Sequence, residues 1–138
     1  MNSILPIFHL KCELIYMSQN IAQDILFRRV QKELRGIEGV KTTLVASRDG
    51  YVLCPPTEYH LEKYAKASSS ILKTADAVIL KMGKVCSESI VVDYQNERLI
   101  ATRAGPKALI AVLAGSDTNL NPILTELSKA ANKVREIM

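Results

Sequence analysis

The spacing of apolar residues along the chain predicts three helices. Between residues 18 and 36, apolar positions recur every three or four residues, as they do on one face of an amphipathic helix. A second helix is predicted over residues 57–82, because Thr57 can cap its start and Gly83 can end it. A third begins at Asn121-Pro122, a cap residue followed by a first-turn proline, and carries an apolar stripe to Ile137.

The second predicted helix has an unusual composition along its inner face. The residues expected to point inward are Leu61, Tyr64, Ala65, Ser68, Ile71, Leu72, Ala75, Val78 and Ile79. The middle of this helix is rich in small residues, so another backbone could approach it closely. Its lysines fall largely on the outer side, where they form either a solvated face or a docking stripe; the possible docking residues are Lys63, Lys66 and Lys73.

Five strands are predicted between these helices. Two β-branched runs, residues 40–47 and 51–54, flank Asp49-Gly50, which is the dipeptide typical of a tight hairpin turn. Residues 89–94, 98–103 and 107–114 form a meander. The apolar run at the end of this meander lacks alternation, which is typical of a central strand covered on both faces.

The order of the predicted elements is α-β-β-α-β-β-β-α. No strand is followed by a helix and a returning strand in strict alternation, so the sheet is expected to be antiparallel with helices on both faces. The chain is therefore predicted to be an α/β protein of the α+β sandwich type. Its 138 residues are enough for one hydrophobic core and too few for two.

Composition narrows the range of functions. Hydrophobic residues make up 48% and charged residues 23%, as in ordinary globular proteins. Aromatic residues make up only 5% and tryptophan is absent, which argues against a base-stacking nucleic-acid module, so no nucleic-acid partner is expected. The net charge of +4 permits an acidic partner without requiring one.

The amino-terminal stretch is a separate feature. Residues 4–16 are apolar, but Pro6, Lys11 and Glu13 interrupt them, and they are too short for a membrane span. We expect no integral membrane segment. Because Met17 precedes the first predicted helix, residues 1–17 are either an amino-terminal arm or a misassigned start, and the domain covers residues 18–138.

The cysteines and histidines offer little chemistry. Cys12, Cys54 and Cys86 are widely spaced without a CxxC pair, so neither disulfides nor a zinc site is expected, and a cytoplasmic location fits best. Cys54 and His60 could be a nucleophile and its base, but Cys54 is better explained as a small apolar residue at a strand end. No glycine-rich phosphate loop is present. We expect no catalytic, cofactor-binding or metal-binding residues.

Residues 36–53 resemble the opening of a roadblock, or dynein light chain roadblock, domain. In this family a helix leads through a Gly-Val entry, here Gly39-Val40, into an apolar strand, an Asp-Gly turn and a second short strand. The helix with small residues, the meander and the alanine-rich last helix continue the likeness over residues 18–138.

The resemblance implies a profilin- or longin-like fold, a five-stranded antiparallel sheet with one helix on one face and two on the other. It also implies a homodimer that pairs its central helices and extends its sheet through the third strand. The interface would then contain Tyr64, Ala67, Ser68, Ile71, Ile90, Val91 and Val92. Pairing would cover an apolar strand that is otherwise an exposed sheet edge.

Three functional hypotheses follow. The first is a non-enzymatic dimeric module that regulates or scaffolds a Ras-like small GTPase, which is the partner that the family resemblance implies. The second is a longin- or profilin-like subunit of a motor or trafficking complex without a GTPase partner. The third is a small enzyme that uses Cys54.

Overall fold

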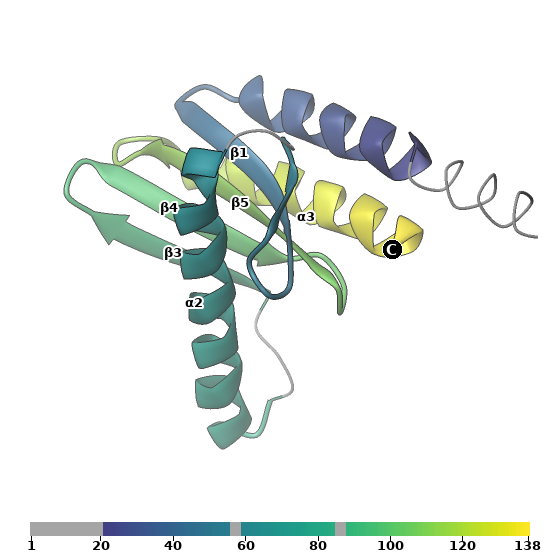
Figure 1. The fold of residues 1–138 in the computed structure, drawn as a ribbon. Coiled ribbons are helices and arrows are strands. Elements are labelled where there is room, and N and C mark those ends of the chain that lie inside the picture. The colour runs from purple at the N-terminus through teal and green to yellow at the C-terminus, as the bar shows by residue number, and fades with distance from the viewer. Residues whose placement is uncertain (1–20, 56–58, 85–87) are drawn as a thin grey trace, which may run out of the picture.

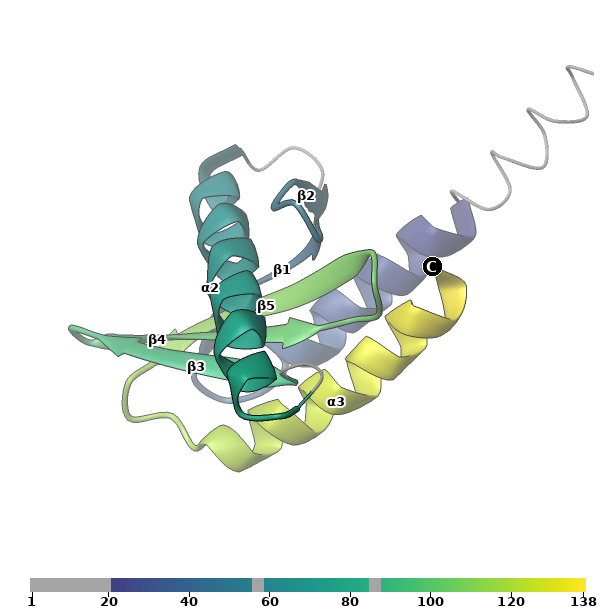
Figure 2. The same ribbon diagram turned by 90° about the horizontal axis from the view of Figure 1, so that it is seen from below.

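The computed structural model describes residues 21–55, 59–84 and 88–138. A five-stranded antiparallel sheet separates two helical layers (Figures 1 and 2). Helix α2 covers one face, while α3 and the helix over residues 21–35, here called the first helix, cover the other. The predicted order of elements and the predicted fold class are both confirmed. The bounds are β1 Val40–Ser47, β2 Val52–Cys54, α2 Glu62–Lys81, β3 Ser89–Tyr94, β4 Glu97–Arg103, β5 Ala108–Gly115 and α3 Leu120–Ile137.

The strands lie in the order β2-β1-β5-β4-β3, and every pairing is antiparallel. Strand β5 is central, with Val112 opposite Thr43 of β1 and Ile100 of β4. All but its last residue are buried, as its apolar run predicted. Strand β3 lies at one edge, and β4 is its only neighbouring strand among the described residues.

Each face of the sheet has its own apolar cluster. Phe27, Val30 and Leu34 of the first helix pack with α3 residues such as Leu127 and Val134 on one face. On the other face α2 packs through a second set of residues, which includes Leu61, Ala65, Leu72, Leu99 and Leu109. Because strand side chains alternate between faces, β1, β4 and β5 supply both clusters.

Several element ends differ from the sequence predictions. Helix α3 is capped by Asn119 instead of Asn121, since the Asn119 side-chain oxygen accepts the N–H of Asn121 at 3.2 Å. Pro122 nevertheless lies in the first turn, where no helical N–H partner is needed. The capping residue predicted for α2, Thr57, lies outside the described residues; the α-helical part begins at Glu62 after a 3-10 turn over Tyr59–Leu61.

Two glycines shape the chain around α2. Gly83 has a φ of +80° and ends α2 as predicted: its N–H donates to Leu80, while the N–H of Lys84 donates to Ile79. Gly50, with a φ of +92°, closes the β1–β2 hairpin, where its N–H donates to the carbonyl of Ser47. The hairpin is confirmed, but residues 48–51 form a longer connection than the predicted tight turn.

Helix α2 crosses the sheet and continues past the edge strand β3 (Figure 1). Val78, which the periodicity placed on the inner face, is therefore 52% exposed. Leu80 and Met82 are also exposed on this part of the chain. The sheet ends before the helix does, so the apolar residues Val78, Leu80 and Met82 are not covered by the sheet.

Candidate functional site

The edge strand β3 combines a free backbone edge with apolar side chains. Ile90, Val92 and Tyr94 are half-buried and pack in the cluster beneath α2, while Val91 points to the opposite face and is exposed. Burial, together with the Glu97 carboxylate that accepts its hydroxyl at 3.0 Å, raises the pKa of Tyr94 to about 12. An exposed apolar strand edge is a ready template for another strand.

One side of α2 continues this apolar edge. Tyr64, Ala67, Ile71 and Val78 recur at helical spacing beside the buried stripe, and Tyr64 and Ile71 join the same cluster as the β3 side chains. Ala67 and Val78 are exposed. We call the combined area the pairing surface; it consists of Tyr64, Ala67, Ile71 and Val78 of α2 with Ile90, Val91 and Val92 of β3.

Ser68 differs from the other residues predicted for the interface. Its side chain is fully buried against the sheet, and its Oγ has no hydrogen-bond partner among the described residues. Ser68 thus lets α2 lie close to its own sheet and has no exposed surface to offer a second chain. Of the remaining six predicted residues, Tyr64, Ile71, Ile90 and Val92 pack in one cluster. Ala67 is exposed on α2, and Val91 points to the opposite face of β3.

The three predicted docking lysines are exposed on the outward side of α2. Lys66 lies over the ring of Tyr51, 4.6 Å from its centroid, and Lys73 Nζ lies 3.5 Å from Asp49 Oδ1. Lys63 lies 5.1 Å from the centroid of the Tyr64 ring. Among the residues that the structure describes, Lys73 is the only one of the three with a carboxylate in ion-pair distance, so the outer side of α2 is basic.

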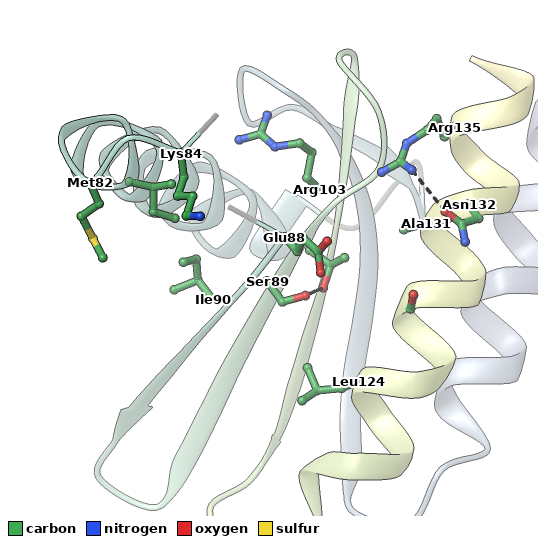
Figure 3. A pocket seen from close by; sticks show the side chains of 13 residues that line it. Met82, Lys84, Glu88, Ser89, Ile90, Arg103, Leu124, Ala131, Asn132 and Arg135 are labelled. Carbon is green, nitrogen blue, oxygen red and sulfur yellow. Dashed lines mark hydrogen bonds between the residues drawn. The ribbon is translucent and has the colours of Figure 1, made fainter. Parts of the chain in front are cut away.

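A hollow of about 790 Å³ opens at the start of β3, where α2 passes the sheet (Figure 3). Met82 and Ile90 line it on the α2 side, and Leu124 and Arg135 of α3 line it on the other side. Inside it, the hydroxyls of Ser89 and Thr102 lie 2.9 Å apart. The hollow runs around the free edge of β3, so it extends the pairing surface and offers a mixture of apolar and hydrogen-bonding groups to a neighbouring chain.

The possible nucleophile Cys54 lies in an unfavourable place for chemistry. It is 1% exposed, and its Sγ donates to Gln31 Oε1 at 3.4 Å. Burial, with a smaller contribution from Asp24, raises the pKa of Cys54, which favours the less reactive thiol. His60 is instead an exposed residue of the 3-10 turn before α2.

Metal-binding clusters and membrane-spanning helices are both absent from the described ranges. No three histidine, cysteine, aspartate or glutamate side chains lie close enough together there to hold a metal ion. In residues 21–55, 59–84 and 88–138, no helix has the length and apolar character needed to cross a membrane.

A five-stranded antiparallel sheet with helices on both faces defines an α+β fold, which here has an apolar edge strand and a basic helix beside it (Figure 2). The chain belongs to the Roadblock/LC7 domain family, whose family model matches residues 26–114, more than half of its length. The family resemblance of the sequence is therefore confirmed.

The relatives and structural neighbours agree with this assignment. An uncharacterised protein of Methanocaldococcus jannaschii is 25% identical over 109 residues, covering 78% of this chain and 95% of the relative. A structure of MglB in a tetrameric arrangement has a TM-score of 0.72 and 20% identity over 84% of this chain and 90% of its own. Profilin IA of Acanthamoeba castellanii has a TM-score of 0.57 and 12% identity, over 80% and 96% respectively, which confirms the profilin-like fold.

Proposed function

We propose that this roadblock-type module is a non-enzymatic homodimer that binds a Ras-like small GTPase and regulates or scaffolds it. The pairing surface carries this proposal. It joins a strand edge to a helix side that has small and apolar residues at helical spacing. Within residues 21–55, 59–84 and 88–138, no further strand pairs with this edge.

The pairing surface suits a second copy of the same chain. An antiparallel contact between two β3 strands would satisfy the backbone groups of both edges, and a two-fold axis would bring the α2 helices side by side. Ala67 has no long side chain to hold the helices apart, while Ile71 and Val78 supply apolar area. The tetrameric arrangement of MglB shows that a protein of this fold self-associates, which supports the proposal.

The family resemblance implies the Ras-like GTPase as the partner, and the lysines of α2 suggest where it binds. Pairing two α2 helices would place Lys63, Lys66 and Lys73 of both copies on one side of the dimer, as a broad basic surface. Such a surface attracts an acidic partner and speeds its association. A cytoplasmic location, where such GTPases act, belongs to the same proposal.

Binding to purified Ras-like GTPases of the same organism tests this function. Each GTPase is loaded with GDP or with a non-hydrolysable GTP analogue, and its affinity is measured by isothermal titration calorimetry. We expect one GTPase to bind about tenfold more tightly in one nucleotide state than in the other. The variant Lys66→Glu with Lys73→Glu should bind more weakly, since it reverses charge on the docking side of α2.

The matched control is Lys129→Glu with Lys133→Glu, which reverses two exposed charges on α3, on the other face of the sheet. This control should retain the affinity. If no GTPase binds in either state, the longin- or profilin-like subunit without a GTPase partner becomes the better account.

A further inference from the structure

The outer face of the first helix has exposed apolar and basic residues that core packing does not explain. Phe27, Val30 and Leu34 point into the core, and the opposite side of the helix is exposed. Ile21 and Ile25 are 58% and 55% exposed, although both are large and apolar. Basic residues continue this exposed side of the helix toward its end: Arg28, Arg29, Lys32 and Arg35.

The basic part of this face is poorly neutralised. Arg28 pairs with Asp24, four positions earlier, at 3.1 Å. Arg29, Lys32 and Arg35 have no carboxylate within ion-pair distance among the residues that the structure describes. Three positive charges therefore remain without a partner along two turns of an exposed helix.

Helix α3 lies beside the first helix in the same layer (Figure 2). The first helix begins its described part beside the end of α3, as Figures 1 and 2 show, and the two helices are joined by Lys133 and Glu33 at 3.5 Å. Ile137, at the end of α3, is 36% exposed. The start of the first helix and the end of α3 therefore each have an exposed isoleucine.

The sequence before the first helix repeats the same spacing. Ile7, Leu10, Leu14 and Met17 precede Ile21 at intervals of three and four residues. This spacing is a property of the sequence alone, and the proposed surface consists of residues of the first helix. Large exposed apolar residues together with Lys and Arg on one helix are typical of helices that lie on the surface of a bilayer.

We propose that the outer face of the first helix docks on an anionic lipid surface. Ile21 and Ile25 enter the boundary between headgroups and acyl chains, while Arg29, Lys32 and Arg35 contact the anionic headgroups. Reversible surface binding of this kind requires both an apolar and a basic contribution, and the face supplies both.

Two other occupants fit this face less well. A second copy would set the arginines against the isoleucines or against one another, because a two-fold contact brings a patch onto itself. An acidic protein would pair with the basic residues but would leave no role for the exposed isoleucines. The face lies across the sheet from the pairing surface, so the proposal does not depend on dimerisation or on a GTPase.

Vesicle binding of the full chain tests the proposal. Sedimentation with vesicles of phosphatidylglycerol and phosphatidylcholine is compared with sedimentation with phosphatidylcholine alone. The variant Arg29→Gln, Lys32→Gln, Arg35→Gln should lower the partition coefficient on anionic vesicles about a hundredfold, at about fivefold for each charge. The variant Ile21→Ser with Ile25→Ser should lower it at least about tenfold.

The matched control Lys63→Gln, Lys66→Gln, Lys73→Gln removes the same charge from α2 and should change the partition coefficient by no more than a few fold. Because the chain has no tryptophan, Ile25→Trp supplies a single reporter whose emission should shift to the blue on anionic vesicles. All changed residues of the first helix are exposed, and thermal unfolding of each variant verifies the fold.

Three results would overturn the proposal. The first is a wild-type chain that sediments with neither kind of vesicle. The second is an equal loss of binding in the α2 control, which would indicate attraction by net charge alone. The third result combines two measurements. The solution mass of the variant Ile21→Ser with Ile25→Ser would be lower than that of the wild type, and vesicles would leave the emission of Ile25→Trp unchanged. Together they would assign the face to a second copy of the chain.

Discussion

Cys54 occupies the end of β2 inside the cluster formed by the first helix and α3. Its thiol donates to Gln31 Oε1, and Gln31 Nε2 donates to the carbonyl of Thr43 at 3.1 Å, so the side chains form a buried polar link. Burial raises the pKa of Cys54 above its ordinary value of 9.0. The thiolate is therefore disfavoured in the folded state relative to the unfolded chain.

This shift predicts a pH dependence of stability. Because the folded pKa of Cys54 is the higher one, its contribution is present below the ordinary value of 9.0 and is lost as pH rises toward the folded pKa. The free energy of unfolding, measured in urea, should favour the wild type over Cys54→Ala at neutral pH. This advantage should shrink in alkaline buffer; a constant difference would show that the thiol does not titrate in this range.

The ion pair between Asp76 of α2 and Arg103 of β4 is the second feature at this scale. Their side chains are only 24% and 18% exposed, whereas those of Lys73 and Asp49 are 53% and 76% exposed. Asp76→Ala should lower the free energy of unfolding by about 1–3 kcal/mol, since Arg103 would lose a charged partner while partly buried. The control Asp49→Ala should change it by less than about 0.5 kcal/mol. Equal losses of unfolding free energy in the two variants would contradict the stronger role of the Asp76–Arg103 pair.

Residue patterns could not predict this pair. Asp76 and Arg103 are separated by 27 positions, and their meeting depends on the angle at which α2 crosses the sheet. The cap of α3 was also mistaken, because Asn119 and Asn121 are chemically equivalent candidates and only the backbone decides between them. Local chemistry predicted that a cap exists without identifying which residue supplies it.

At the scale of elements, the approach of α2 to the β1–β2 hairpin depends on Gly50. A Cβ at this position would lie 2.9 Å from Lys66 Cα, and the φ of +92° is itself unfavourable for other residues. Gly50→Ala should therefore lower the free energy of unfolding by about 2–4 kcal/mol, which is more than backbone strain alone would cause.

Gly83 is the matched control for this substitution. Its φ of +80° is similar, but a Cβ there would meet nothing within 4 Å. Gly83→Ala should cost about 1–2 kcal/mol, from the strained backbone alone. Chemical denaturation of both variants measures the difference; equal losses would show that contact with α2 is unimportant.

Periodicity predicted the elements well and their surroundings less well. The bounds of β1 and β3 agree with the sequence prediction, because alternating β-branched runs ended by turn residues define strands locally. Ser68 and Val78 show the limit. Helical spacing places both on the apolar half of α2, but only the position of the sheet edge buries Ser68 and exposes Val78.

At the scale of the whole molecule, the two faces of the sheet differ in what they offer a partner. The α2 face has the pairing surface with basic residues beside it, and the opposite face has the isoleucines and arginines of the first helix. The residues of the third strand predicted an apolar strand, and the family resemblance implied that this strand lies at an edge of the sheet. They could not show that α2 extends past that edge.

The solution mass of the chain tests the central claim, homodimerisation through the pairing surface, most directly. Light scattering coupled to size exclusion is applied to the wild type, to Ala67→Arg on the pairing surface, and to the control Ala77→Arg. Both alanines are exposed on α2, but Ala77 lies on its outward side. The account predicts twice the chain mass of 15.3 kDa for wild type and control, and the single chain mass for Ala67→Arg. A monomeric wild type, or a dimer that Ala67→Arg leaves intact, would contradict it.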